Sequence, residues 1–377
     1  MINKTLRVRI YLNKTQQKKI DTTINCCRFI RNHMIERNRK QYERRKEHLN
    51  YIAMQNLLPR MKKYLPWLAE ADSQALKYAC RQVDDAYQCF FKKLSGYPQF
   101  SSKRESLQSY TTTNAKTIHY KKGYIKIPCI GWVKAHDARK LPSGSEICQA
   151  TVTRDHGQYY ASICYKIEET AVPVQINDDN VIGLDYKSDG LYTDSNGNCC
   201  DMPHYYLNAQ EAVIKEQRRL SRKVGNHKGE KHSGNYIRQQ KRLFKKTRHV
   251  ANQRKDFLHK ESTAIAKQYD AICVEDLNMK AVANKGFRNG KATLDNGYGM
   301  FLVMLNYKLR DRGRQLVRID KWFPSSQLCS SCGYKQKMPL HVRTYDCPQC
   351  GNHMDRDYNT AINIRNEGLR ILKEKSA

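Results

Sequence analysis

The stretch that decides the fold is Val181-Ile182-Gly183-Leu184-Asp185, a short apolar run that ends on an acid. A run of this length without polar alternation predicts a strand that is buried on both faces and has its acid at the edge of a sheet. A second strand is predicted over 190–194, and Asn196-Gly197 indicates a hairpin turn that leads into a third strand near 199–202. This part of the chain therefore opens with three predicted strands.

Downstream of this run, helices and strands alternate. Residues 208–268 are highly basic and are predicted to be helical with a break around 225–234, and 271–274 is predicted to be a further buried strand. A helix over 300–310 and a strand over 315–319 follow. Three strands, a helix, a strand, a helix and a strand form the element order of an RNase H-like fold, which many α/β domains approximate. The order alone predicts an α/β domain and is weak evidence for the RNase H-like type.

Upstream, the pattern indicates a β module with helices inserted in it. Alternating apolar residues predict a strand over 4–12, and apolar residues at helical spacing predict helices over 20–46 and 67–94. Strand patterns return over 110–169, where Asp155-His156-Gly157 indicates a hairpin turn. A helical insert within a β module is the simplest account of this half.

The composition indicates a polyanionic partner. The chain has 377 residues, a formal net charge of +32 and 24 tyrosines. A positive field of this size attracts nucleic acid, and aromatic rings among basic residues suit stacking on unpaired bases. The start has no apolar core of a signal peptide, and no apolar run is long enough to span a bilayer. We therefore expect a nucleic-acid-binding protein of a reducing compartment, with no membrane partner.

Four of the fourteen cysteines have the spacing of metal ligands. Cys329-Ser330-Ser331-Cys332 and Cys347-Pro348-Gln349-Cys350 form two knuckles, and a glycine follows each. Four thiolates in this pattern favour one tetrahedral zinc ion in a structural site, because no ligand position is left open. A redox pair is the alternative for either half alone, whereas the other ten cysteines look like scattered core residues.

Three separated acids form the candidate catalytic set. Asp185 ends one apolar strand, Glu275 ends another, and Asp357 precedes the last predicted helix. Carboxylates held close together repel one another and need a cation, and Mg²⁺ is the natural one because it prefers oxygen ligands. Two such ions can stabilise the attacking and leaving oxygens in phosphodiester hydrolysis. Two alternatives remain open. Asp355 could cap the last helix, with Asp357 merely in its first turn. Asp276 could take the place of Glu275, because the alternation of side chains does not identify the functional acid in a strand that is buried on both faces.

The order of these motifs resembles the TnpB family, transposon-encoded nucleases related to type V CRISPR effectors. The likeness spans nearly the whole chain, and its specificity comes from the concatenation rather than from any one piece. In chain order, the segments that carry it are Gly96-Tyr97-Pro98-Gln99-Phe100, Gly183-Leu184-Asp185, Asp256-Phe257-Leu258-His259-Lys260, Val274-Glu275-Asp276-Leu277, Phe323-Pro324-Ser325-Ser326-Gln327-Leu328-Cys329, the four cysteines, and Asp355-Arg356-Asp357-Tyr358-Asn359.

The resemblance implies an α/β architecture around a RuvC nuclease domain of RNase H-like fold, interrupted by a zinc ribbon. A wedge β-barrel with an inserted helical recognition lobe precedes it. The implied boundaries are 1–16 and 104–172 for the wedge β-barrel, 17–103 for the helical lobe, 173–178 for a linker, 179–323 and 353–377 for the split RuvC domain, and 324–352 for the zinc ribbon, which binds target nucleic acid.

The resemblance also implies an RNA-guided endonuclease that cuts double-stranded DNA beside a short target-adjacent motif by two-metal hydrolysis. The three acids are then the ligands of two Mg²⁺ ions, and the four cysteines hold one structural Zn²⁺. The implied partners are a transposon-derived guide RNA, one per protein chain, and double-stranded target DNA, in the prokaryotic cytosol and nucleoid. Base pairing would read the sequence, while the protein reads backbone shape.

Contacts to nucleic acid are expected in two places. By alignment with the family, residues of the helical lobe and wedge read the target-adjacent motif; the alternative is that the first of them is a core aromatic and the others are solvated. They are Tyr51, Ser73, Gln74, Lys77 and Thr113.

The second place is the basic stretch from Lys215 to Lys260, which is expected to grip the heteroduplex backbone. A solvated helical hairpin is the alternative, although such dense like charge repels itself unless a polyanion neutralises it. The candidate contacts are Arg218, Arg219, Arg222, Arg242, Lys245, Lys246, Arg248 and Arg254.

One position departs from the family. Two residues after the first acid, where the family usually has glycine, this chain has Lys187. Its side chain either contacts DNA phosphate or disturbs the metal site. Because all three acids are present, we expect an active enzyme.

Two other functions share parts of this pattern. A non-catalytic RNA-guided DNA-binding regulator would share the fold and the charge, but such proteins are expected to have lost acids of the triad. A conventional RNase H-like transposase would need a sequence-specific DNA-binding module, and the sequence gives no helix-turn-helix signal.

Overall fold

The computed structural model describes residues 1–102, 107–136, 140–168, 171–224, 233–282, 290–339 and 341–376. The chain has an α/β fold and divides into two compact units, Met1–Glu169 and Thr170–Ala377. Within the described ranges, no helix combines the length and the apolar character that crossing a membrane requires.

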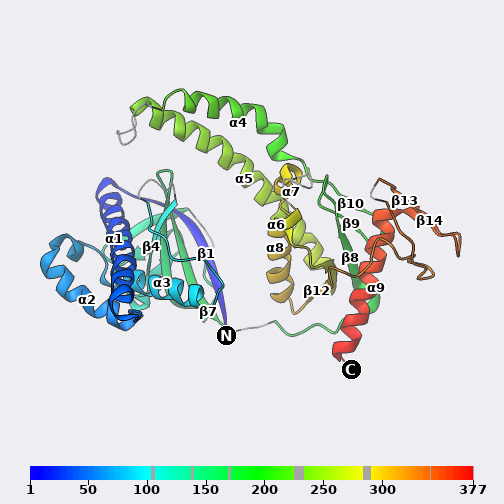
Figure 1. The fold of residues 1–377 in the computed structure, drawn as a ribbon, viewed down its shortest axis with the longest axis horizontal. Helices are drawn as coiled ribbons and strands as arrows, with labels where there is room; N and C mark the ends of the chain where they lie inside the picture. Colours follow the sequence, from blue (N-terminus) through cyan, green and yellow to red (C-terminus); the bar gives the residue numbers. More distant parts are fainter. Residues whose placement is uncertain are drawn as a thin grey trace. The chain divides into compact units, whose positions relative to one another are not determined.

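The first unit is built on a seven-stranded antiparallel sheet (Figure 1). Its strands are β1 (Ile2–Tyr11), β2 (Leu107–Thr112), β3 (His119–Lys121), β4 (Tyr124–Ile127), β5 (Gly131–His136), β6 (Glu146–Asp155) and β7 (Gln158–Ile167). The order is β2-β6-β7-β1-β5-β4-β3, so the first strand of the chain lies between β7 and β5. Among the described pairings, none joins the edge strands β2 and β3. The predicted hairpin turn joins β6 to β7, with His156 at φ 46° and Gly157 at φ 81°.

Three helices are inserted between β1 and β2: α1 (Lys14–Arg45), α2 (Tyr51–Tyr64) and α3 (Ser73–Phe91). Asn13 begins α1 with a capping box, and Asn50 and Asp72 cap the other two. The helices form one apolar core with the sheet.

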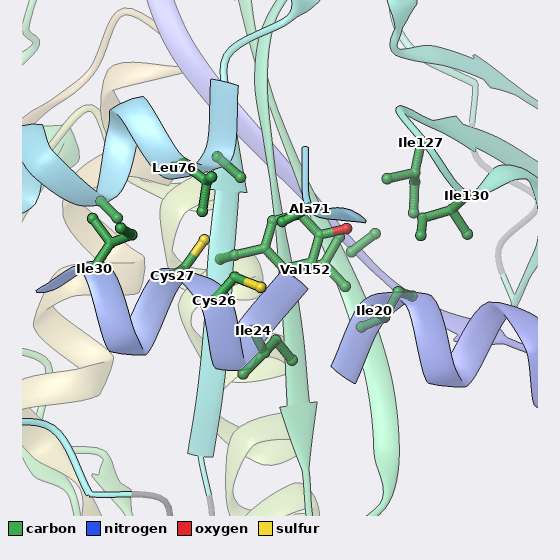
Figure 2. Packing of buried hydrophobic residues seen from close by; sticks show 14 of the residues in the cluster. Ile20, Ile24, Cys26, Cys27, Ile30, Ala71, Leu76, Ile127, Ile130 and Val152 are labelled. Carbon is green, nitrogen blue, oxygen red and sulfur yellow. The ribbon is translucent and has the colours of Figure 1, made fainter. Parts of the chain in front are cut away.

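Figure 2 shows the centre of this core, where one face of α1 meets α3 and the sheet. Ile20, Ile24 and Ile30 recur at helical spacing on α1, and all three are fully buried. Cys26 and Cys27 lie among them as small apolar residues, and burial raises the pKa of the Cys26 thiol to about 11. These two thiols therefore pack as core residues, as the sequence predicted.

The second unit is built on a five-stranded mixed sheet in the order β10-β9-β8-β11-β12. Its strands are β8 (Val181–Tyr186), β9 (Tyr192–Asp194), β10 (Cys199–Cys200), β11 (Ala271–Glu275) and β12 (Gln315–Ile319). β8, β11 and β12 are parallel, whereas β9 and β10 are antiparallel to their neighbours. The carboxyl ends of the three parallel strands therefore meet at one edge of the sheet.

Helices cover both faces of this sheet. The described helices of this unit are α4 (Tyr205–Ser221), α5 (Gly234–Gln268), α6 (Met279–Val282), α7 (Gly290–Asn296), α8 (Tyr298–Arg310) and α9 (Arg356–Ser376), of which α5, α8 and α9 share the apolar clusters of the sheet. Ile182 and Leu184 of β8 pack into a cluster with α5 and α8, whereas Val181 and Cys273 pack with α9 on the other face. The alternation of side chains along a strand thus divides the sheet between two helical layers.

Two glycines allow α9 to lie close to the sheet. A Cβ at Gly183 would lie 2.2 Å from the carbonyl oxygen of Ala361 and 2.6 Å from the backbone nitrogen of Arg365. On the helix side, a Cβ at Gly368 would lie 2.1 Å from the Sγ of Cys273. Since the contacts at Gly183 are with backbone atoms, glycine there fixes the distance between β8 and α9.

Most of the predicted elements are present. The strand predicted over 315–319 is β12 residue for residue, and the three strands predicted from 181 onward are β8, β9 and β10. The sequence reading missed α2, which contains Pro59, a residue that usually interrupts a helix. The centre of the predicted helix break, 225–232, lies outside the described residues, as does the predicted boundary between 103 and 104.

Candidate active site and metal centre

Two of the three candidate catalytic acids end neighbouring parallel strands. In the register of β8 and β11, Leu184 is the partner of Val274, so the next residues, Asp185 and Glu275, are neighbours at the carboxyl edge. Two-residue alternation places both acids on the face that α9 covers, because Val181 and Cys273 pack against that helix.

The third acid comes from the covering helix itself. Asp357 lies in the first turn of α9, and α9 contacts both β8 and β11. The carboxylate of Asp355 accepts a hydrogen bond from the backbone N–H of Tyr358 at 3.0 Å. The capping role considered for Asp355 is therefore present, and it holds the turn that carries Asp357. We call Asp185, Glu275 and Asp357 the acidic edge.

Burial and mutual repulsion dominate the electrostatics of the acidic edge. Burial, followed by the charges of Glu275 and Asp357, raises the pKa of Asp185 well above its ordinary value. Burial also raises the pKa of Glu275, against the effect of a 2.5 Å hydrogen bond that the Ser325 hydroxyl donates to its Oε1. The pKa of Asp357 is raised by burial and then by Asp355. Such a set of carboxyls is stabilised by a cation.

The structure distinguishes Glu275 from Asp276, between which the sequence could not choose. Asp276 follows the end of β11, is exposed, and forms an ion pair of 2.7 Å with Arg318. Glu275 is half-buried, accepts the hydrogen bond from Ser325 and acts electrostatically on Asp185. Glu275 is therefore the acid that belongs to the edge.

Two cations border the acidic edge. The Nη1 of Arg343 lies 3.9 Å from the Oδ2 of Asp357. The Nζ of Lys187 lies 3.6 Å from the Oδ1 of Asp201, and its charge, after those of Arg343 and Arg356, opposes the rise in the pKa of Asp357. Lys187 is thus close enough to act on the third acid.

The four predicted cysteine ligands converge. Their sulfur atoms all lie within 4.8 Å of one another, with 3.6 Å between Cys329 and Cys350 and 3.6 Å between Cys332 and Cys347. Four sulfurs at about 2.3 Å from a central zinc would be about 3.8 Å apart in a tetrahedron, so the spacing fits that ion. Among the residues that the structure describes, the three carboxylates of the acidic edge do not form a ligand cluster of this kind.

Each pair of this cysteine cluster (Cys329, Cys332, Cys347 and Cys350) is held by the same local turn. The N–H of Gly333 donates to the carbonyl of Cys329 at 2.9 Å, and that of Gly351 donates to the carbonyl of Cys347 at 3.0 Å. The φ angles of these glycines are 76° and 72°, in the left-handed region that favours glycine. Burial raises the pKa of Cys329, but N–H groups of its own turn and the neighbouring thiols outweigh burial, and the net pKa is lowered. This lowered pKa favours the thiolate that a metal requires at Cys329, whereas burial and hydrogen bonds with neighbouring thiols raise the pKa values of Cys332 and Cys350.

The sequence reading assigned no role to two asparagines, Asn359 and Asn363, that connect the cysteine cluster to α9. Asn359 accepts a hydrogen bond from the N–H of Ser330 at 2.9 Å and donates to the carbonyl of Leu328 at 2.7 Å. Asn363, one turn later, donates to the carbonyls of Ser325 and Leu328, each at 2.8 Å. Both asparagines are buried. The available signal in the sequence was a pair of asparagines four residues apart, shortly after the third acid. Their side chains join α9 to the first knuckle and to Ser325, the serine that contacts Glu275.

The strands β13 (Thr344–Asp346) and β14 (His353–Asp355) form the hairpin that carries the second knuckle. Tyr345 is fully buried between the knuckles, and its hydroxyl lies 3.1 Å from the carbonyls of Gln327 and Tyr334. The cysteine cluster therefore has a small core of its own.

The basic stretch forms a hairpin of two long helices, α4 and α5, which lie side by side in Figure 1 and contact each other. Its polar centre is Glu216, which accepts hydrogen bonds from the buried Gln239 at 2.5 Å and from Arg219 at 3.1 Å. Lys246 lies 3.7 Å from the same carboxylate. Two of the predicted phosphate contacts are thus partly neutralised within the hairpin.

The other predicted contacts of this basic hairpin differ in exposure. Arg254 forms an ion pair of 2.7 Å with the fully buried Asp295, so its charge is already paired within the fold. Arg248 lies over the ring of Phe244 at 5.2 Å. The four remaining side chains are exposed and form no ion pair within the described part of the chain: Arg218, Arg222, Arg242 and Lys245.

The residues predicted to read the target-adjacent motif lie in the first unit. Tyr51 begins α2 and packs against the apolar core, which agrees with the alternative that it is a core aromatic. Ser73, Gln74 and Lys77 lie in the first turns of α3, where Ser73 accepts a hydrogen bond of 2.7 Å from Lys62. Thr113 is exposed directly after β2, a strand that α3 contacts.

Comparison with known proteins gives the chain its family. Family models match residues 162–285 ("Probable transposase"), 298–364 ("Cas12f1-like, TNB domain") and 1–47 ("Helix-turn-helix domain"). The chain is 30% identical to "Putative RNA-guided DNA endonuclease" of Streptomyces pristinaespiralis, over 98% of this chain and 90% of that one. The chain belongs to the TnpB family. It is also 28% identical to "Putative RNA-guided DNA endonuclease InsQ" of Escherichia coli, over 92% of this chain and 87% of that one.

A solved structure shares the fold of this TnpB family member. "Cryo-EM structure of the Cas12f1-sgRNA-target DNA complex" matches with a TM-score of 0.59 at 11% identity, over 97% of this chain and 99% of that chain. At this identity the likeness concerns the fold. The segment matched by the helix-turn-helix model contains β1 and the single long helix α1, and no second helix follows a turn before residue 47.

Proposed function

We propose that the protein is an RNA-guided endonuclease that cuts double-stranded DNA at the acidic edge. The relatives from Streptomyces pristinaespiralis and Escherichia coli are named for RNA-guided DNA cleavage. The observation that carries the proposal is the convergence of three carboxyls with raised pKa values at the carboxyl ends of parallel strands. The strand order β10-β9-β8-β11-β12 supports a RuvC domain of RNase H-like fold over 179–323 and 353–377.

Mg²⁺ fits the acidic edge because the donors are carboxylate oxygens that repel one another. Asp185, Glu275 and Asp357 would hold two such ions, whose charge would stabilise the attacking and leaving oxygens of the phosphodiester. Ser325 orients Glu275, and the Asp355 cap holds the helical turn of Asp357. Lys187 acts electrostatically on Asp357, and its side chain is proposed to contact a DNA phosphate near the edge.

Zinc fits the cysteine cluster, because four thiols with near-tetrahedral spacing leave no open position for substrate. Its role is structural: the ion would hold the segment 324–352 in the shape to which Asn359 and Asn363 are bonded. Through those asparagines, the cysteine cluster supports the helix that carries the third acid.

The remaining parts of the chain suit binding of guide and target. The four exposed basic residues of the hairpin are proposed to contact the backbone of the guide–target heteroduplex, in one protein chain per guide RNA. Ser73, Gln74, Lys77 and Thr113 are proposed to read the target-adjacent motif from the helical lobe and wedge.

The test uses the chain loaded with its native guide RNA and a target plasmid, with and without Mg²⁺. Asp185→Asn keeps the side-chain size and removes the charge, and it should abolish cleavage while leaving guided binding largely intact, because backbone contacts supply most of the affinity. Asp276→Asn is the matched control and should cut normally, since Asp276 is exposed and paired with Arg318.

Each outcome assigns a function. Linear plasmid from the parent chain, lost in Asp185→Asn and retained in Asp276→Asn, supports the nuclease. Guided binding without cleavage by the parent chain would indicate a regulator, and joined DNA ends would indicate a transposase. Normal cutting by Asp185→Asn would refute the acidic edge as the active site.

A further inference from the structure

The loop that follows β12 begins and ends beside the acidic edge. At its start, Ile319 is the register partner of Glu275 in β11. At its end, the hydroxyl of Ser325 donates to the carboxylate of Glu275. Both ends of the segment 320–324 are therefore fixed to the same acid, and whatever the loop displays lies near that acid.

What the loop displays is Trp322. This side chain is 81% exposed, although tryptophan is among the residues that gain most from burial. The carboxylate of Asp320 accepts a hydrogen bond of 2.6 Å from the N–H of Trp322, and the carbonyl of Asp320 accepts one of 3.0 Å from the N–H of Phe323. Phe323 packs against the core under α9. The turn is thus anchored on both sides of an outward-facing indole.

One cation lies beside the indole, and an open groove with two cations and two acids in its lining adjoins the loop. The Nζ of Lys321 lies 5.0 Å from the centre of the Trp322 ring, within the range of a cation–π contact. An open groove of about 660 Å³ adjoins the loop. Arg318, Asp320 and Lys321 line it together with Asp276, Leu277, Asn278 and Ile319.

We propose that Trp322 stacks on one unpaired base of the DNA strand to be cut and, with Lys321 near the adjoining phosphate, holds that strand across the acidic edge. The flat face of an indole fits any base, so the contact is independent of sequence. It requires an unpaired nucleotide, because in a duplex both faces of a base are covered by its neighbours. This inference rests on the proposed nuclease function, and it adds a positioning residue that contacts substrate.

Cleavage by the guide-loaded complex tests the proposal. Trp322→Ala should slow cleavage of a single-stranded target about 10–100-fold, the effect expected from removing one base–aromatic stack, and Trp322→Phe should restore most of the rate. Val303→Ala, which truncates another exposed apolar side chain of the same unit, should cut normally.

An abasic scan separates stacking from a structural role. In the parent chain, removing the base at one position of the target strand should slow cutting about as much as Trp322→Ala does, and in Trp322→Ala the same removal should cost nothing more. The proposal would be overturned if the effects of Trp322→Ala and of base removal on the cleavage rate were additive, or if Trp322→Ala cut at the wild-type rate.

A binding measurement without Mg²⁺ keeps the proposal separate from the nuclease function. The fluorescence that the parent complex loses in Trp322→Phe is the part contributed by Trp322. Oligothymidylate should quench this part in the parent complex, and it should cause no such quenching in Trp322→Phe. Quenching without any cleavage would sink the proposed function while supporting the stack. Quenching by oligouridylate alone would assign Trp322 to RNA, and no quenching together with normal cleavage would sink only the stack.

Discussion

The acidic edge and the cysteine cluster are tied to the same helix, yet they are assembled in opposite ways. The cysteines come from two turns within 329–350, each closed by its own glycine and backbone hydrogen bonds. The acids come from β8, β11 and α9. They are brought together only by the parallel register of β8 with β11 and by the packing of α9 against both strands. One site is local and the other depends on the whole fold.

The difference shows how each site responds to damage. A local site fails when one ligand is removed, whereas a long-range site also fails when the packing between its elements changes. The two sites are nevertheless coupled, because Asn359 and Asn363 of α9 bond to the first knuckle. The following predictions test how far each site is independent.

The largest expected effect is loss of the metal from the cysteine cluster. Cys347→Ser should lose about one zinc per chain, because metal binding of this kind contributes about 10–16 kcal/mol in small zinc domains. Metal analysis measures the zinc, and hydrogen exchange should show reduced protection over 327–355 that extends into the first turn of α9. Cys89→Ser, an exposed cysteine of the first unit, is the control. Full zinc content in Cys347→Ser would show that the ligand set is wrong.

The next effect tests the long-range assembly. Gly183→Ala places a methyl group 2.2 Å from a backbone oxygen of α9, so the helix must move away from β8. Overpacking of this kind costs about 1–3 kcal/mol, and in a unit of this size each kcal/mol lowers Tm by about 2–4 °C. Zinc content should be unchanged while cleavage falls. Gly299→Ala, where the nearest atoms lie at an ordinary 3.7 Å, should change Tm little. Full cleavage by Gly183→Ala would show that the acidic edge tolerates displacement of α9.

The pH dependence of stability should reveal the repulsion at the acidic edge. The carboxyls have raised pKa values in the folded protein, so they favour folding below about pH 4 and oppose it as pH rises through their folded pKa values. Without added Mg²⁺, Asp185→Asn should therefore raise Tm by a few degrees at pH 7–8 and by little near pH 4. Each kcal/mol gained in the free energy of unfolding corresponds to about 2–4 °C in Tm. Mg²⁺ should raise the Tm of the parent chain but not of the variant. A pH-independent gain in a thermal melt would contradict this account.

The smallest effect should leave both sites intact. Replacing Arg218, Arg222, Arg242 and Lys245 with glutamine removes exposed charges of the basic hairpin that are not committed to an ion pair within the described residues. The slope of log affinity against log salt should fall by about 0.7–0.9 for each phosphate that the variant no longer neutralises. Zinc content, Tm and preference for the target-adjacent motif should not move. An unaltered slope would mean that the hairpin is a solvated surface.

How much the sequence could predict follows from the same contrast. The cysteine cluster was predictable because two spacings and two glycines contain all of its local geometry. Asp185 and Glu275 could be proposed because each ends an apolar run, and Asp357 because it precedes the last predicted helix. Alternation along the strand could not choose between Glu275 and Asp276. That choice depends on which face of β11 meets α9, and it required the packing of Cys273 against that helix.

Other residues were beyond sequence reasoning because their roles are set by partners distant in the chain. Arg254 belongs to a dense basic run and was predicted to bind phosphate, yet its partner Asp295 lies on another helix and is fully buried. Tyr51 is similar, because only the folded first unit shows that its ring packs on the core. Charge density predicts a basic surface, but it does not say which members are already neutralised.

The close seating of α9 has a consequence for biosynthesis. The ribosome makes β8 and β11 well before it reaches Asp357, and the cysteine cluster is also made first. The acidic edge therefore cannot exist on a nascent chain until α9 has emerged and settled against Gly183. While the chain is being translated, every strand of the sheet can form without a complete set of acids, and the order of synthesis alone delays any nuclease activity until α9 has been made.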